Sequence, residues 1–184
     1  MIITLGGKSG SGKSTVAKLL AKKLNFEHYS NGDFMRELAR QKNISLLELS
    51  KIAETTREID EILDKRQREL GESQDNFIID SRLGFHFIPN SKKIFLDADL
   101  EIRAKRILND KIRKESNITL KEAIRNIKLR EKSEMARYKQ YYNLNPYDKK
   151  NFDFVINTTK SNSEEITKQI LDFVNSAPSN QPDI

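Results

Sequence analysis

Residues 7–15 carry the clearest chemical signal in the chain, a glycine-rich run with a lysine and a hydroxyl at fixed spacing. The run from Gly7 to Ser14 reads G-K-S-G-S-G-K-S and matches the pattern G-x-x-x-x-G-K-[ST]. The apolar segment Ile2 to Leu5 precedes it, and a helical pattern from Lys13 to Leu24 follows it. In this context glycines let backbone N–H groups approach an anion, and the helix N-terminus adds a favourable dipole. The run, called the phosphate loop below, therefore predicts binding of a nucleoside triphosphate.

Two side chains of the phosphate loop have chemical roles of their own. The Lys13 ammonium is expected to contact the β- and γ-phosphates, and the Ser14 hydroxyl is expected to ligate Mg²⁺. A glycine-rich surface turn is the ordinary alternative, but such a turn has no need of the Gly-Lys-Ser triplet. The positions expected to hold ATP with Mg²⁺ are Gly7, Lys8, Ser9, Gly10, Ser11, Gly12, Lys13, Ser14 and Thr15.

A second polar stretch follows the apolar segment Phe26 to Tyr29. It runs from Ser30 to Arg36, reads S-N-G-D-F-M-R and leads into a helical pattern. The Arg36 guanidinium can bind a phosphate through two parallel hydrogen bonds. Arg36 can equally be a solvated helix arginine whose stem covers apolar surface. The stretch is thus a candidate second anion site.

The apolar segment Phe77 to Ile79 leads into Asp80, Ser81 and Arg82. Because the carboxyl ends of parallel strands share one edge of a sheet, these residues are expected beside the phosphate loop. Asp80 is expected to hold a Mg²⁺-bound water, unless it is only a turn residue at the strand end. Arg82 is expected to point toward the cleft beside the phosphate loop.

Arginines recur at helical spacing in the second half of the chain. They are Arg103, Arg106, Arg113, Arg130 and Arg137. Phosphoryl transfer spreads negative charge over the moving group, so converging arginines are expected of a kinase. Arginines are also common on charged helices that have no catalytic role.

Short apolar segments with helical patterns between them predict an α/β fold. The expected strands are Ile2 to Leu5, Phe26 to Tyr29, Phe77 to Ile79, Lys93 to Leu96, and Phe154 to Ile156. The expected helices are Lys13 to Leu24, Asp33 to Arg40, one that begins after Ser45, about Arg57 to Leu70, about Leu100 to Arg113, Thr119 to about Tyr142, and about Ser163 to Val174. Asn31 and Ser45 are expected to cap the second and third helices, and Gly71 is expected to end the fourth. Thr119 is expected to cap the sixth, with Glu122 as its partner in a capping box. The near-continuous β-branched segments predict a five-stranded parallel sheet covered by helices on both faces.

Two long helical insertions interrupt this alternation. Insertions at the carboxyl ends of strands are where α/β proteins hold substrates and move lids. We expect one domain over 1–184, with a core at 1–29, 72–107 and 137–175. An insert is expected at about 30–71, a lid at about 108–136 and a disordered tail at 176–184.

The composition excludes several classes of protein. The chain of 184 residues has no cysteine, and its two histidines, His28 and His86, cannot form a zinc site alone. It has no apolar run long enough for a membrane span and no visible secretory leader, so we expect a cytoplasmic protein. We expect it to be a monomer. The net charge of +6 invites a nucleic-acid partner, but basic and acidic residues are interleaved, as in Arg125 to Glu131, which argues against one.

The ordered set of motifs resembles the cytidylate kinases, most closely the compact archaeal type within the adenylate kinase-like nucleoside monophosphate kinases. The resemblance covers the chain up to its tail. Its segments are Gly7 to Thr15, Ser30 to Leu38 (S-N-G-D-F-M-R-E-L), Ala53 to Gln67 (with E-I-D-E-I-L-D-K-R-Q), Asp80 to Gly84, Lys93 to Arg106 (K-I-F-L-D-A-D-L-E-I-R-A-K-R), Arg130 to Tyr142 (R-E-K-S-E-M-A-R-Y-K-Q-Y-Y), and Phe152 to Thr158 (F-D-F-V-I-N-T).

The resemblance implies a P-loop kinase fold with a helical acceptor-binding insert and a short helical lid. It implies that Lys13 and the loop amides hold the ATP phosphates. Arg36 and Arg82 would hold the phosphate of the acceptor nucleotide, and Arg130 and Arg137 would be lid arginines that close on the transferring group.

The resemblance also assigns residues to the acceptor nucleotide. Asp60 and Asp64, one helical turn apart, could accept a hydrogen bond from the exocyclic amine of cytosine. They can equally be surface partners of Lys65 and Arg68. The other acceptor-site positions that the resemblance implies are Ser30 and Asp33.

The chain departs from the family pattern at Lys8, Asn31, Arg57 and Ser81. Asn31 and Ser81 lie where the acceptor should bind, so base specificity is the property they affect. The leading hypothesis is an ATP- and Mg²⁺-dependent kinase of CMP and dCMP. The alternatives are a kinase of UMP or AMP, and a P-loop ATPase associated with RNA.

Overall fold

The structure, a computed structural model, describes residues 1–110 and 118–176. The expected tail beyond residue 176 and residues 111–117 of the expected lid, among them Arg113, lie outside the described residues.

Five parallel strands form one sheet in the order β2-β3-β1-β4-β5. The strands are β1 (Ile2–Gly7), β2 (Glu27–Ser30), β3 (Phe77–Asp80), β4 (Lys92–Asp97) and β5 (Phe154–Asn157). The predicted five-stranded parallel sheet is confirmed. β1 lies at the centre, and its Leu5 is in register with Asp80 of β3 and Ile94 of β4. Asp80 therefore ends β3 at the edge from which the phosphate loop leaves β1.

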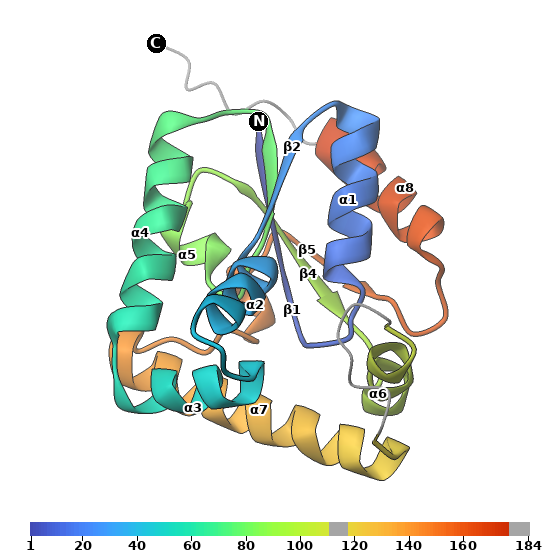
Figure 1. Ribbon diagram of the computed structural model, residues 1–184. Helices are drawn as coiled ribbons and strands as arrows, with labels where there is room; N and C mark the ends of the chain where they lie inside the picture. The colour runs from blue at the N-terminus through green and yellow to red at the C-terminus, as the bar shows by residue number, and fades with distance from the viewer. Residues whose placement is uncertain (111–117, 177–184) are drawn as a thin grey trace.

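Helices cover both faces of the sheet (Figure 1). They are α1 (Lys13–Leu24), α2 (Asn31–Gln41), α3 (Leu46–Thr55), α4 (Glu58–Ser73), α5 (Gly84–Phe87), α6 (Leu100–Leu108), α7 (Leu120–Tyr142), a 3₁₀ turn (Lys149–Asn151) and α8 (Ser163–Ser176). Ile3 and Leu5 of β1 pack in one core with α1 and α8, whereas Ile2 packs in another with Leu70 of α4. This alternation is the period of two that a strand imposes on its side chains.

α7 runs across the molecule at the carboxyl ends of the strands, close to α3 and α6 (Figure 1). The Ser133 hydroxyl of α7 donates to the Glu54 carboxylate of α3. The long helix therefore faces both the phosphate loop and the insert. Among the described residues, no helix is long and apolar enough to cross a membrane.

Three helix ends differ from the prediction. The cap of α2 is Ser30, whose Oγ accepts the Asp33 N–H at 3.2 Å, and Asn31 is already helical. α4 continues past Gly71 to Ser73. A Cβ at Gly71 would lie only 3.1 Å from Ile88, so this glycine allows close packing and does not end the helix. α6 ends at Leu108, before the predicted Arg113, in a turn where Asp110 N–H donates to a backbone carbonyl one turn earlier.

The short helix α5 was not predicted. It contributes Phe85 and Phe87 to an aromatic core with Phe95 and Phe152. Four residues are too few to show a helical period, so aromatic packing, not patterning, marks this element.

Candidate active site

The phosphate loop joins β1 to α1 at the carboxyl edge of the sheet (Figure 1). α1 begins at Lys13 with Gly12 as its N-cap, which offers the first turn no side-chain acceptor. The helices α2, α3 and α7 are instead capped by the hydroxyls of Ser30, Ser45 and Thr119. The first N–H groups of α1 can therefore bind an anion.

Lys13 is folded back onto the loop that precedes it. Its Nζ donates to the carbonyl oxygens of Gly7 and Lys8, both at 2.9 Å, and the side chain is buried. The ammonium is thus held within the loop where it is expected to meet the phosphates.

Neighbouring elements fix the loop backbone. Gly10 has a φ of 79°, and a Cβ there would lie 2.5 Å from the Arg103 carbonyl oxygen, so only glycine lets α6 approach this closely. The Arg103 Nη1 donates to the Ser9 carbonyl at 3.2 Å. The Thr158 hydroxyl, beyond β5, donates to the Ser11 carbonyl at 2.9 Å. Residues far apart in sequence therefore hold one loop conformation.

Asp80 lies beside this loop at the end of β3. Its Oδ1 accepts the Ser30 hydroxyl at 3.1 Å, and its Oδ2 lies 3.2 Å from His28 Nε2. Burial alone would raise the pKa of Asp80, but the hydrogen bond from His28 and the charge of Lys13 hold it below its usual value. Asp80 is therefore a carboxylate at neutral pH.

The donor set fits Mg²⁺ in its usual manner. Mg²⁺ prefers oxygen ligands, retains several waters and takes much of its coordination from substrate phosphates. The Ser14 hydroxyl and the Asp80 carboxylate supply such oxygens. Both Asp80 oxygens already have hydrogen-bonding partners, which favours contact through a water. Within residues 1–110 and 118–176, no group of three or more histidine or acidic residues could hold a metal alone.

Arg82 also lies at the phosphate loop. Its Nη1 donates to the Gly7 carbonyl at 2.9 Å, and its Nη2 donates to the Ser9 hydroxyl at 2.8 Å. Its Nε donates to Glu134 of α7 at 2.8 Å. Lys13, Asp80 and Arg82 thus come together at one edge of the sheet.

The predicted acceptor residues of α2 form a separate group. Half-buried Arg36 pairs with Asp33, one turn earlier on the same helix. Asn31 Nδ2 donates to the Ser81 hydroxyl at 3.0 Å, and this hydroxyl donates to the buried Gln67 amide. Two of the four positions at which the chain departs from the family pattern, Asn31 and Ser81, therefore contact each other and tie α2 to the end of β3.

Asp60 and Asp64 lie in a third group, between α4 and α7. Both are buried, with exposed fractions of 2% and 5%, so the alternative of surface pairing is wrong. Burial raises the pKa of Asp60 to about 6, against the charge of Arg137. Burial also raises the pKa of Asp64, whose carboxylate accepts the Tyr142 hydroxyl.

Arg137 and Arg130 occupy different environments on α7. Arg137 is buried, its Nε lies 3.2 Å from Asp60 Oδ2, and its Nη2 donates to the Tyr138 hydroxyl at 3.3 Å. The Asp60–Arg137 contact is an ion pair whose alignment is too poor for a hydrogen bond, so neither atom has such a partner among the described residues. Arg130 is half-buried, and its charge lowers the pKa of Glu134.

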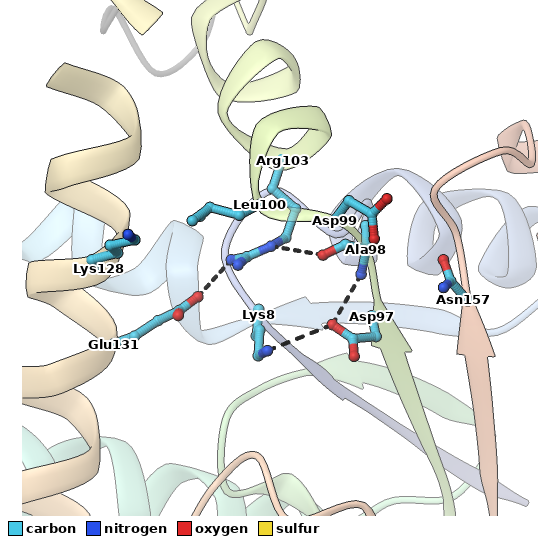
Figure 2. Close-up of a pocket in the computed structure, with 9 residues that line it drawn as sticks. All are labelled: Lys8, Asp97, Ala98, Asp99, Leu100, Arg103, Lys128, Glu131 and Asn157. Atoms are coloured by element: carbon cyan, nitrogen blue, oxygen red, sulfur yellow. Dashed lines mark hydrogen bonds and ion pairs between the residues drawn. The ribbon is translucent and has the colours of Figure 1, made fainter. Parts of the chain in front are cut away.

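Two cavities flank the site. One, of about 420 Å³, lies beside the phosphate loop where β4 meets α6 and α7 (Figure 2). It is lined by Lys8, Asp97, Ala98, Asp99, Leu100, Arg103, Lys128, Glu131 and Asn157. The other, of about 430 Å³, is lined by residues of β2, α2 and α4. They are His28, Tyr29, Ser30, Asp33, Phe34, Glu37 and Arg66.

Sequence reasoning missed six residues that the geometry brings into the site. They are His28, Gln67, Glu131, Glu134, Tyr142 and Thr158, each bonded to a residue that was predicted or to its neighbour. Only the glutamates carried a signal, because they lie three residues apart on an arginine-rich helix.

Comparison with known proteins extends these findings. A model of the cytidylate kinase-like family matches residues 2–160. The cytidylate kinase of Methanobrevibacter smithii is 40% identical over 93% of this chain and 96% of the relative. The cytidylate kinase of Natronomonas pharaonis is 39% identical over 95% of this chain and 90% of the relative.

Solved structures agree on the fold. A shikimate kinase from Bacteroides thetaiotaomicron superposes with a TM-score of 0.65 over 95% of this chain and 98% of its own, at 17% sequence identity. This likeness confirms the P-loop kinase fold and says nothing of the substrate. Because the family model spans most of the chain and the relatives match it nearly end to end, the protein belongs to the cytidylate kinase-like family.

Proposed function

We propose that the protein is an ATP-dependent kinase that transfers the γ-phosphate of ATP to CMP, and to dCMP, giving ADP and the cytidine diphosphate. The observation that carries the proposal is the meeting of Lys13, Asp80 and Arg82 at the phosphate loop, in a chain of the cytidylate kinase-like family. A kinase of UMP or AMP remains the alternative within the same reaction class. An RNA-associated ATPase is not favoured, because the full-length relatives are cytidylate kinases.

In the proposed reaction an oxygen of the acceptor phosphate attacks the γ-phosphorus in line. The new P–O bond forms as the bond from the γ-phosphorus to the oxygen of the departing ADP breaks. The nucleophile is already an anion, so no general base is required. Lys13, the N–H groups of α1 and the arginines would stabilise the spreading negative charge.

Bound Mg²⁺ would neutralise phosphate charge, with the Ser14 hydroxyl as a ligand and Asp80 bonded to a coordinated water. The depressed pKa of Asp80 supports this role, because the charged carboxylate accepts a stronger hydrogen bond from such a water than the protonated acid would. His28 and Ser30 would orient the carboxylate.

On the acceptor side, Arg36 and Arg82 would bind the CMP phosphate, and Ser30 and Asp33 would line its site. Asp60 and Asp64 would face the exocyclic amine of cytosine. Arg36 pairs with the Asp33 carboxylate in this structure, so CMP binding would exchange this partner for phosphate oxygens.

The organisation of the chain follows from these roles. Residues 30–71 would act as the acceptor-binding insert, and α7 would carry the lid arginines Arg130 and Arg137. α7 is continuous from residue 120 to 142 and so crosses residue 136, where the lid was predicted to end. Motion of the lid would therefore also move residues 137–142, which were predicted to belong to the core. We place the enzyme in the cytoplasm, where nucleotides are metabolised, and propose a monomer, which size-exclusion chromatography would check.

Product analysis tests the proposal. With ATP, MgCl₂ and CMP, wild-type protein should form ADP and CDP in equal amounts, with no ADP when CMP is omitted. ADP and free phosphate released without CDP would identify an ATPase and refute the kinase.

A further inference from the structure

Two glutamates on one face of α7 reach arginines of other elements. Glu131 and Glu134 are three residues apart, a spacing that places side chains together on a helix. Glu131 pairs with Arg103 of α6, as Figure 2 shows. Glu134 pairs with Arg82, its Oε2 lying 2.8 Å from the arginine Nε.

Both arginines bond the same short piece of the phosphate loop. Arg103 donates to the Ser9 carbonyl at 3.2 Å, and Arg82 donates to the Ser9 hydroxyl at 2.8 Å. Arg82 also donates to the Gly7 carbonyl at 2.9 Å. Ser9 is therefore held through its backbone by one arginine and through its side chain by the other.

These pairs are shielded from water. The Arg103 side chain is 3% exposed, and those of Arg82, Glu131 and Glu134 are 15–18% exposed. Burial would raise the pKa of Glu134, but the charges of Arg82 and Arg130 lower it to about 2. If the carboxylate partner of a shielded arginine is removed, the free-energy cost of burying the guanidinium charge remains, but no opposite charge offsets it. Arg103 also donates its Nε to the Ala98 carbonyl at 3.0 Å, so the glutamates act together with backbone acceptors to fix where both guanidinium groups lie.

We propose that Glu131 and Glu134 are positioning residues, which hold Arg103 and Arg82 against Ser9 and so couple α7 to the phosphate loop. Neither glutamate needs to touch a substrate. The inference rests on the proposed function for one point, namely that the ligands bound here are ATP and CMP. The helix that carries Arg130 and Arg137 is thereby tied to the loop that binds the donor.

ATP binding, measured by calorimetry on the full chain with MgCl₂, is the first test. Glu131→Gln and Glu134→Gln should each weaken the Kd for ATP about fivefold or more, the scale of a charge-assisted hydrogen bond. Glu69→Gln is the matched control, because it removes an exposed pair with Lys65 on α4, and it should change the Kd less than about twofold. Unchanged ATP affinity in both α7 variants would overturn the proposal.

A double-mutant cycle separates positioning from general loosening of the fold. Ser9→Ala removes only the hydroxyl that Arg82 bonds, so in the Glu134→Gln background it should add less than about twofold to the Kd. In the Glu131→Gln background, Ser9→Ala should change the Kd for ATP by the same factor as in the wild-type protein, because Arg103 bonds the Ser9 backbone, which the substitution leaves in place. If the fold-changes in the Kd for ATP caused by Ser9→Ala and by Glu134→Gln simply multiply, the two residues act independently, and the proposed coupling of Glu134 to Ser9 through Arg82 is contradicted. Thermal unfolding of ligand-free samples confirms that each titrated variant is folded.

The two substrates provide a further separation. Glu131→Gln should raise the KM for ATP and leave that for CMP within about twofold, since Arg103 bonds the phosphate loop and, within the described part of the chain, none of the predicted acceptor residues. Equal rises in both would contradict the assignment. Wild-type protein that binds ATP but transfers nothing to CMP would refute the proposed function and leave the coupling to be decided by the titrations. Wild-type protein that binds no ATP would refute both.

Discussion

At the scale of single residues, the proposed reaction depends on the charge of Lys13. Its Nζ lies within the phosphate loop, 2.9 Å from two carbonyl oxygens. Lys13→Ala should lower kcat about 100-fold or more, the usual loss when one electrostatic contact to a transition state is removed. Steady-state kinetics measure this, with exposed Lys18→Ala on the same helix as the control. A loss of less than about threefold would show that Lys13 is not the phosphate ligand.

Arg36 and Arg40 form a matched pair on α2, because each bonds an acidic residue one turn earlier. Arg36 is half-buried in the middle of the helix, whereas Arg40, near its end, is exposed. Arg36→Ala should raise the KM for CMP about tenfold or more, because a bidentate phosphate contact is lost. Arg40→Ala should stay within about twofold. Equal CMP kinetics in the two variants would show that Arg36 is only a solvated arginine.

The sequence predicted the residues of the phosphate loop because one short motif specifies both their types and their spacing. It did not predict Glu134, whose partner Arg82 is 52 positions away. Pairings of this kind depend on how α7 lies across the sheet, which no local pattern encodes. The same reason hid Thr158, which bonds Ser11 from the opposite end of the chain.

At the scale of elements, α4 meets α7 through buried charges, and this makes stability depend on pH. The pKa of Asp60 is raised from 3.8 to about 6, first by burial, so the folded state keeps its proton to higher pH than the unfolded chain. The stability that Asp60 contributes is then present below pH 4 and lost as the pH rises to about 6, by up to about 3 kcal/mol.

Asp60→Asn should remove this component and flatten the free energy of unfolding between pH 4 and 6. Urea unfolding across that range measures it, and exposed Asp172→Asn on α8 is the control for loss of a charge. An unchanged slope in the Asp60 variant would contradict the raised pKa.

The contact between Tyr142 and Asp64 joins the same two helices. Tyr142→Phe leaves a buried carboxylate without its donor and should lower the free energy of unfolding by about 1–3 kcal/mol. Tyr141→Phe removes a neighbouring hydroxyl that makes no hydrogen bond in the described part of the chain, and should cost less than about 0.5 kcal/mol. Equal losses would mean that the hydroxyl of Tyr142 has no special role.

Most elements followed from local sequence. Ser45 and Thr119 were predicted as caps and both are confirmed, each with a glutamate that completes a capping box. The errors arose where tertiary packing decided the outcome. Gly71 lies inside α4, where it allows Ile88 to pack closely, and α5 packs in an aromatic core that a pattern search does not detect.

At the scale of the whole molecule, the net charge of +6 does not require a nucleic-acid partner. Arg36, Arg82, Arg103 and Arg137 each pair with a carboxylate at or near the site. Such pairs hold the guanidinium groups in place before an anionic substrate arrives. The substrate must then displace or share the paired carboxylate. The fold class was predictable from alternating strands and helices, whereas these pairings required the three-dimensional structure.

The acceptor preference of the wild-type enzyme tests the central claim most directly. Coupled measurement of ADP formation gives kcat/KM for CMP, dCMP, UMP and AMP with ATP and MgCl₂, and Lys13→Ala serves as the inactive reference. We expect CMP or dCMP to exceed UMP and AMP by about tenfold or more, because a site built to hydrogen-bond one base leaves polar groups unsatisfied with another. If none of the four supports acceptor-dependent ADP formation, the protein is not a nucleoside monophosphate kinase.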